Sequence, residues 1–141
     1  MDNAVWLFLA VPAWYSSAII SPFGAGPLTE IPALGIASLA VGIVLGILSR
    51  KTSLLIFLLL PAASQILVVV AGFLRGAFRS DGNQLSFWLS AFVLLQIACA
   101  AYLVWRLRGA RRPATALAVF TSSYAFFAAF VAAMAFSDNW L

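Results

Sequence analysis

Five apolar segments, separated by short polar connections, constrain the fold of this chain more than any other feature of its sequence. Each segment is close to the roughly 20 helical residues that cross the hydrocarbon core of a bilayer. The pattern predicts an all-α fold, a polytopic transmembrane bundle of five helices, with residues 1–141 forming a single transmembrane domain. The expected spans are residues 4–21, 31–49, 53–75, 85–107 and 114–136.

The composition excludes a soluble domain. Hydrophobic residues make up 65% of the chain and charged residues only 9%, whereas soluble domains are about half apolar and about a quarter charged. A short chain also leaves a large fraction of its surface exposed, so it could not hide this much apolar surface from water. The lipid bilayer is therefore the expected surrounding of the protein.

The first segment is the weakest of the five. Pro12 lies in its middle, and Tyr15, Ser16 and Ser17 make its second half polar. A re-entrant or interfacial helix is the alternative for this segment, and it would leave four spans instead of five. We favour five.

The basic residues predict an orientation. Five spans place the start of the chain on the side that holds most of the positive charge, and basic residues favour the cytoplasmic side. We therefore expect the N-terminus in the cytoplasm and the C-terminus outside, in a bacterial inner membrane. The net charge of +4 arises mostly from clusters at segment ends, so nucleic acid is not an expected partner. The residues on the positive side are Arg50, Lys51, Arg106, Arg108, Arg111 and Arg112.

Small residues recur along one face of the second segment. Gly35, Ser38, Gly42 and Gly46 are spaced so that they share a helix face. Small side chains allow the backbones of two membrane helices to approach closely. This face is the candidate packing face of the chain. It could serve packing within the bundle, or it could dock a second subunit.

The last segment shows two faces of different character. One carries small residues, which suit helix packing. The other carries large residues, which we expect to contact lipid or a partner. The small residues are Thr115, Ala118, Ser122, Ala125, Ala129 and Ala133, and the large ones are Phe120, Tyr124, Phe127 and Val131.

Neutral polar residues lie near the middle of three segments. Gln65 and Gln96 carry amides whose donors and acceptor lipid cannot satisfy, and Ser64, Ser122 and Ser123 are expected at similar depth. Their first interpretation is hydrogen bonding between helices. The alternative is a polar path or pocket for a small neutral solute, water or an ion. Tyr15, Ser16, Ser17 and Tyr124 would extend such a pocket.

The sequence offers little reactive chemistry. It has no histidine, and its four acidic residues fall in the termini and connections, so no catalytic, cofactor-binding or metal-binding residues are expected. The single cysteine, Cys99, is expected to be a small packing residue. We therefore predict that the protein is not an enzyme.

Two functions remain open from the sequence. The first is a non-catalytic integral membrane protein that acts by helix packing, as an accessory subunit or helper of a membrane assembly. The alternative is a small oligomeric channel or facilitative transporter that uses the polar path. Either function requires another copy of the chain or a different membrane protein as partner.

Overall fold

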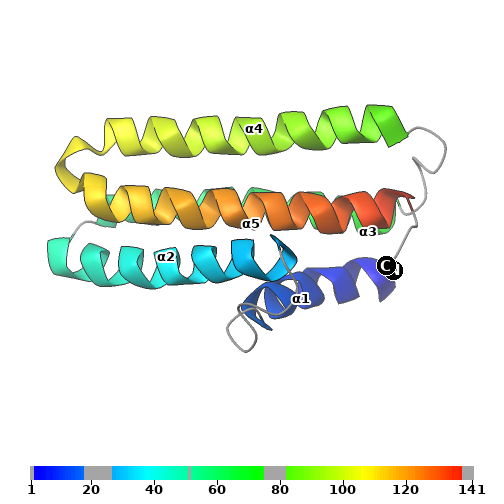
Figure 1. Ribbon diagram of the computed structural model, residues 1–141, viewed down its shortest axis with the longest axis horizontal. Helices are drawn as coiled ribbons and strands as arrows, with labels where there is room; N and C mark the ends of the chain where they lie inside the picture. The colour runs from blue at the N-terminus through cyan, green and yellow to red at the C-terminus, as the bar shows by residue number, and fades with distance from the viewer. Residues whose placement is uncertain (1, 18–26, 51, 75–81, 138–141) are drawn as a thin grey trace.

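The chain folds into α-helices, with two short 3-10 segments, in the part that the structure describes (Figure 1). The computed structural model describes residues 2–17, 27–50, 52–74 and 82–137, and no strand occurs in these ranges. The predicted all-α fold with five helices is therefore confirmed. Lys51, Arg75 and Arg79 lie outside the described residues.

The helices follow the apolar segments closely. The 3-10 segment η1 precedes α3, and the 3-10 segment η2 joins α4 to α5. In chain order the elements are α1 (Asp2–Ser17), α2 (Pro27–Ser49), η1 (Thr52–Leu58), α3 (Leu59–Phe73), α4 (Gly82–Arg106), η2 (Arg108–Ala110) and α5 (Arg111–Ser137).

Three prolines lie in the first turn of a helix. Pro27 begins α2, Pro61 is the third residue of α3, and Pro113 is the third residue of α5. The first turn of a helix tolerates proline because backbone N–H groups there have no helical partner. Pro61 therefore explains why the third apolar segment is a 3-10 helix followed by an α-helix, and not the single continuous helix that its hydropathy suggests.

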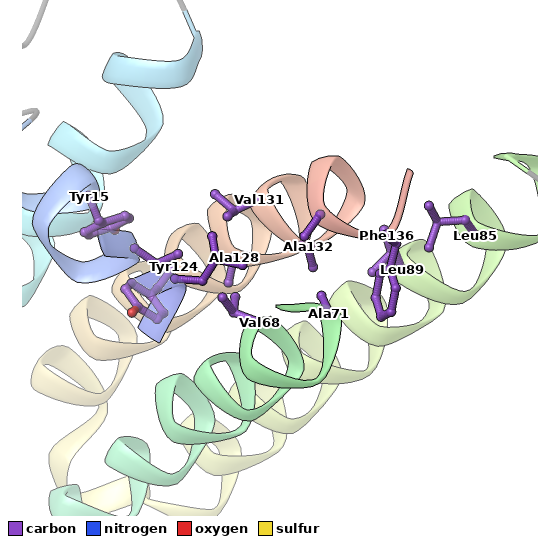
Figure 2. Close-up of a cluster of buried hydrophobic side chains, with 14 residues drawn as sticks. Tyr15, Val68, Ala71, Leu85, Leu89, Tyr124, Ala128, Val131, Ala132 and Phe136 are labelled. Atoms are coloured by element: carbon purple, nitrogen blue, oxygen red, sulfur yellow. The ribbon is translucent and has the colours of Figure 1, made fainter. Parts of the chain in front are cut away.

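Helix α5 is the centre of the bundle. It packs against α2, α3 and α4, which surround it, and also contacts α1. Figure 2 shows Ala128 and Ala132 of α5 in one buried cluster with Val68 and Ala71 of α3. The side chains of Tyr124 and Val131 are also buried in this cluster. The expectation that their face of the helix contacts lipid or a partner is therefore wrong, because α5 packs against α2, α3 and α4.

Four helical segments are long and apolar enough to cross a membrane. They cover Thr29–Ser49, Thr52–Phe73, Asn83–Arg106 and Arg108–Ser137. Helix α1 has 16 residues and its apolar part, Val5–Ser17, is shorter than a span. The structure thus has five helices, of which four have the length of a membrane span.

Helix α1 runs from one end of the bundle towards its middle. It begins at the end where α5 finishes, and it stops beside the central part of α5 (Figure 1). At about 1.5 Å per residue its 16 residues extend only ~24 Å. If all five helices crossed the membrane in alternating directions, α1 would start at the opposite, arginine-rich end. In the structure α1 starts instead at the end where α5 finishes, because it runs in the same direction as α2 (Figure 1).

The arginines gather at the other end of the bundle. This end is formed by the last turn of α2, the start of η1, the end of α4 and the start of α5, on the left in Figure 1. All the described arginines belong to it: Arg50, Arg106, Arg108, Arg111 and Arg112.

Arg50 ends α2 in the left-handed region. Its φ is 49°, and its backbone N–H donates to the carbonyl of Ile47 at 3.1 Å. A side chain costs about 1 kcal/mol in this conformation, whereas glycine adopts it freely. We expect Arg50→Gly to be about 1 kcal/mol more stable than Arg50→Ala in reversible unfolding in mixed micelles. Both variants lose the same charge, so equal stabilities would contradict strain at this turn.

Candidate functional site

A polar cluster joins α1, α2 and α5 in the middle of the bundle. The hydroxyl of Tyr15 lies 2.8 Å from Oγ of Ser123. Ser123 in turn donates a hydrogen bond to the backbone carbonyl of Ile31 at 2.7 Å. Because a serine hydroxyl has one proton, Tyr15 must be the donor in the first contact. The chain of hydrogen bonds therefore runs from Tyr15 through Ser123 to α2, and it holds the end of α1 against the central helix.

Gly35 provides the space for this cluster. A Cβ atom at Gly35 would lie 1.8 Å from the hydroxyl oxygen of Tyr15 and 2.5 Å from Oγ of Ser123. Both distances are far below van der Waals contact, so only glycine fits here. The first member of the candidate packing face thus serves a contact within the chain.

Tyr124 extends the cluster towards α3. Its ring meets the ring of Tyr15 edge to face, with centroids 5.0 Å apart and an interplanar angle of 69° (Figure 2). Such edge-to-face pairs add about 0.5–1.5 kcal/mol beyond the area that they bury. Nε2 of Gln65 donates to the hydroxyl of Tyr124. Oε1 of Gln65 is buried and has no hydrogen-bond partner.

Gln96 belongs to a separate polar contact between α4 and α3. Its Nε2 donates to the carbonyl of Leu60 at 3.2 Å, and Oγ of Ser64 donates to the same carbonyl at 3.2 Å. Oε1 of Gln96 is buried without a hydrogen-bond partner. Each glutamine therefore uses its NH₂ group to reach a neighbouring helix and leaves its carbonyl oxygen unsatisfied.

The structure divides the predicted polar residues between these two places. Gln65 and Ser123 lie in the tyrosine cluster, and Gln96 and Ser64 lie at the carbonyl of Leu60. Ser122 precedes Ser123 on α5 and is half-buried. Gln65 thus contacts α5, whereas Gln96 contacts α3. The two glutamines share no hydrogen-bond partner among these contacts.

The rest of the candidate packing face also lies against the chain itself. A Cβ atom at Gly42 would lie 2.8 Å from Cδ2 of Leu117 on α5, and one at Gly46 would lie 3.2 Å from Cδ1 of Leu54 on η1. Ser38 is half-buried on the same helix. The small residues of this face therefore allow α5 and η1 to approach α2 closely.

From the sequence, Tyr15 was expected only to extend a possible polar pocket, and Gly35 was one residue of the candidate packing face. In the structure the hydroxyl of Tyr15 lies against Gly35. The same hydroxyl contacts Ser123, which is 108 positions away in the sequence. Ser16 and Ser17, by contrast, are exposed and donate to carbonyls of their own helix, at Pro12 and Trp14. The available signal was the run of three polar residues, Tyr15, Ser16 and Ser17, at the end of an apolar helix.

Four of the cavities lined by the described residues lie between the helices or at their ends. The first, of about 470 Å³, is largely apolar and lies between α2, η1 and α5, and the second, of about 750 Å³, lies between α4 and α5. A third, of about 470 Å³, lies at the arginine-rich end between α2 and the start of α5, and a fourth, of about 380 Å³, lies beside Arg106. None of the four is lined by Gln65, Gln96, Ser64, Ser122 or Ser123.

Cys99 does not pack in the core. Its side chain is exposed on the outer side of α4. The expectation that it fills a packing position is therefore wrong, and the reason is that α4 lies at the edge of the bundle. Among the described residues, no three His, Cys, Asp or Glu side chains come together where they could hold a metal ion.

The comparisons with known proteins are negative. The chain matches no family model, no curated protein and no solved structure.

The unsatisfied amide oxygen of Gln96 leads to a prediction. Gln96→Leu removes one long hydrogen bond, but it also removes a buried acceptor without a partner, and Leu60 keeps the bond from Ser64. A buried unpaired polar group costs about 1–3 kcal/mol, more than the roughly 1 kcal/mol that the bond contributes. We expect Gln96→Leu to be as stable as the native chain or up to about 1 kcal/mol more stable. Unfolding in mixed micelles would measure this, and a loss above about 1 kcal/mol would show that Oε1 has a partner such as water.

Proposed function

We propose that the protein is a non-catalytic integral membrane protein that acts by helix packing, as an accessory subunit or helper of a membrane assembly. One observation carries this proposal. The side chains of Gln65, Gln96 and Ser123 join helices of the chain to one another, and they line none of the four cavities described above. These groups have a structural use, which favours a role based on packing over one based on conduction or chemistry.

The outer surface of the bundle suits contact with lipid and with other membrane helices. Helix α4 packs mainly against α5 and leaves the rest of its circumference exposed. That surface is apolar, with small residues such as Ala91, Ala98 and Cys99 between larger ones. In lipid, small residues let a second helix approach closely. The outer side of α4 is therefore a surface of this chain suited to a partner subunit.

The charge distribution supports an orientation for this subunit. Arginine-rich ends of membrane helices favour the cytoplasmic side. With the arginine end in the cytoplasm, the start of α1 and the end of α5 face the opposite side of the membrane. We place the protein in a bacterial inner membrane on the basis of its short connections.

Native mass spectrometry tests the proposal directly. The full chain would be extracted with a mild detergent from the membrane of its own host, and the mass of the complex would be measured. A complex with a second, different protein is the expected result. A monomer or a homo-oligomer, obtained under conditions that keep a known heteromeric membrane complex of the same host intact, would contradict the accessory role.

A facilitative path is the second candidate, and one observation favours it. The amide oxygens of Gln65 and Gln96 are both buried without a partner, so each could accept a hydrogen bond from a passing solute. If this path exists, Gln65→Leu should abolish solute flux in proteoliposomes while the protein stays folded. Unchanged flux through a folded Gln65→Leu variant would exclude a path at Gln65.

A further inference from the structure

Among the residues that the structure describes, the arginine-rich end has no acidic side chain to balance its charge. The four acids of the chain are Asp2, Glu30, Asp81 and Asp138, and none belongs to the segments that form this end. Residues 31–80 and 82–137, which supply every described arginine, contain no Asp or Glu. The positive charge gathered here must therefore be balanced by anions from outside the chain.

A crevice at this end offers a place for such an anion. It has a volume of about 470 Å³ and lies between the last turns of α2 and the start of α5. Arg108, Arg111 and Arg112 line it from one side, and Ser49 lines it from the other. The arginines are exposed, so their guanidinium groups are accessible. Arginine binds phosphate well because its planar group can donate two parallel hydrogen bonds.

The same crevice has apolar walls. Leu45 and Leu48 of α2 and Pro113 of α5 line it beside the arginines, and Leu48 is 74% exposed. A free phosphate would gain nothing from leucines, whereas a phospholipid would place an acyl chain against them. The combination of a cationic rim and apolar walls fits an amphiphile with an anionic head.

The depth of the crevice in the bundle agrees with a lipid headgroup. It lies where the apolar helices α2 and α4 end and α5 begins, which is the level of the membrane surface for helices that span the bilayer. Trp105, at the end of α4, is exposed, and the guanidinium carbon of Arg108 lies 5.3 Å from its ring centroid. Tryptophan is enriched at this level of membrane proteins. Basic pockets between helices at the cytoplasmic surface are suited to anionic lipid headgroups.

We propose that the crevice formed by Ser49, Arg108, Arg111 and Arg112 binds the phosphate of an anionic phospholipid, with an acyl chain against Leu45 and Leu48. The headgroup would supply the negative charge that the chain lacks at this end. It would also link the end of α2 to the start of α5, two elements that meet beside the crevice.

Native mass spectrometry of the purified full chain in detergent tests this site with defined lipids. We expect the chain to retain phosphatidylglycerol in preference to phosphatidylcholine. The variant Arg111→Gln/Arg112→Gln should lower the affinity for phosphatidylglycerol at least about tenfold, because it removes two charge-assisted contacts. The matched control is Arg50→Gln/Arg106→Gln, which removes the same charge from the same end, and its affinity should stay within about twofold.

Three results would overturn the proposal. Equal losses in the two double variants would show a general attraction to the charged end and no defined site. Equal retention of phosphatidylcholine would show that the headgroup charge is not recognised. The third result concerns Leu48→Asn, which should weaken phosphatidylglycerol binding. If this substitution had no effect and millimolar inorganic phosphate displaced the lipid, the crevice would be a site for a soluble anion.

Discussion

Gly35→Ala should destabilise the bundle more than any other single added methyl group on α2. The new Cβ atom would occupy the position of the Tyr15 hydroxyl, at 1.8 Å, and would crowd Ser123 Oγ at 2.5 Å. Tyr15 would have to leave, and its bond to Ser123 and its packing against Tyr124 would be lost. Alanine gains about 1 kcal/mol of helix propensity, but overpacking and the lost hydrogen bonds cost more. We expect a net loss of about 3 kcal/mol in the free energy of unfolding in mixed micelles.

Gly109→Ala is the matched control for this substitution. A Cβ atom at Gly109 would meet nothing within 4 Å, so its stability should stay within about 0.5 kcal/mol of the native chain. A second test uses suppression. Tyr15→Phe removes the atom closest to the new methyl group, so the double variant Gly35→Ala/Tyr15→Phe should recover part of the loss. Additive losses in the double variant would place the cause of the instability elsewhere.

Ala128→Leu should produce the second large effect. Ala128 is fully buried on the central helix, in the cluster that also holds Val68 of α3 (Figure 2). Interiors are close-packed, so three additional carbon atoms force neighbouring helices apart. We expect a loss of about 3 kcal/mol in the same unfolding measurement.

The same substitution on the outer helix provides the comparison. Ala98 is exposed on α4, where lipid or detergent can accommodate a larger side chain. Ala98→Leu should therefore change the free energy of unfolding by no more than about 0.5 kcal/mol. If Ala128→Leu were tolerated as well as Ala98→Leu, α5 would not be the packed centre of the bundle.

Hydropathy alone predicts most of this fold. The number of helices and their approximate positions follow from the apolar segments, because a helix that satisfies its own backbone is the structure that such segments adopt in lipid. The prolines at positions 27, 61 and 113 then refine where α2, α3 and α5 begin. What hydropathy cannot supply is the neighbour of each helix, since every segment here is apolar on most of its surface.

The central position of α5 illustrates this limit. The sequence predicts a packing face from its small residues. It also predicts contact with lipid or a partner for its large residues Tyr124 and Val131. In a soluble protein a large apolar residue points to the core, but in lipid it can face either way. Only the three-dimensional arrangement shows that neighbours lie on both sides of α5.

The buried polar contacts were partly predictable for a similar reason. A glutamine or serine at membrane depth needs a partner, so Gln65, Gln96, Ser64 and Ser123 were identified from the sequence alone. Their partners were not, because two of them are backbone carbonyls, at Ile31 and Leu60, which no residue pattern marks.

The central place of α5 also has a consequence for how the protein is made. Helices α2, α3 and α4 pack chiefly against α5, which follows them all in the chain. While the ribosome is still translating, these earlier helices therefore enter the bilayer without their main neighbour. The contact between Tyr15 and Ser123 cannot form until α5 has been synthesised as far as Ser123. Assembly of the bundle is thus a late event, and until it occurs the nascent helices depend on lipid or on the insertion machinery to cover their packing faces.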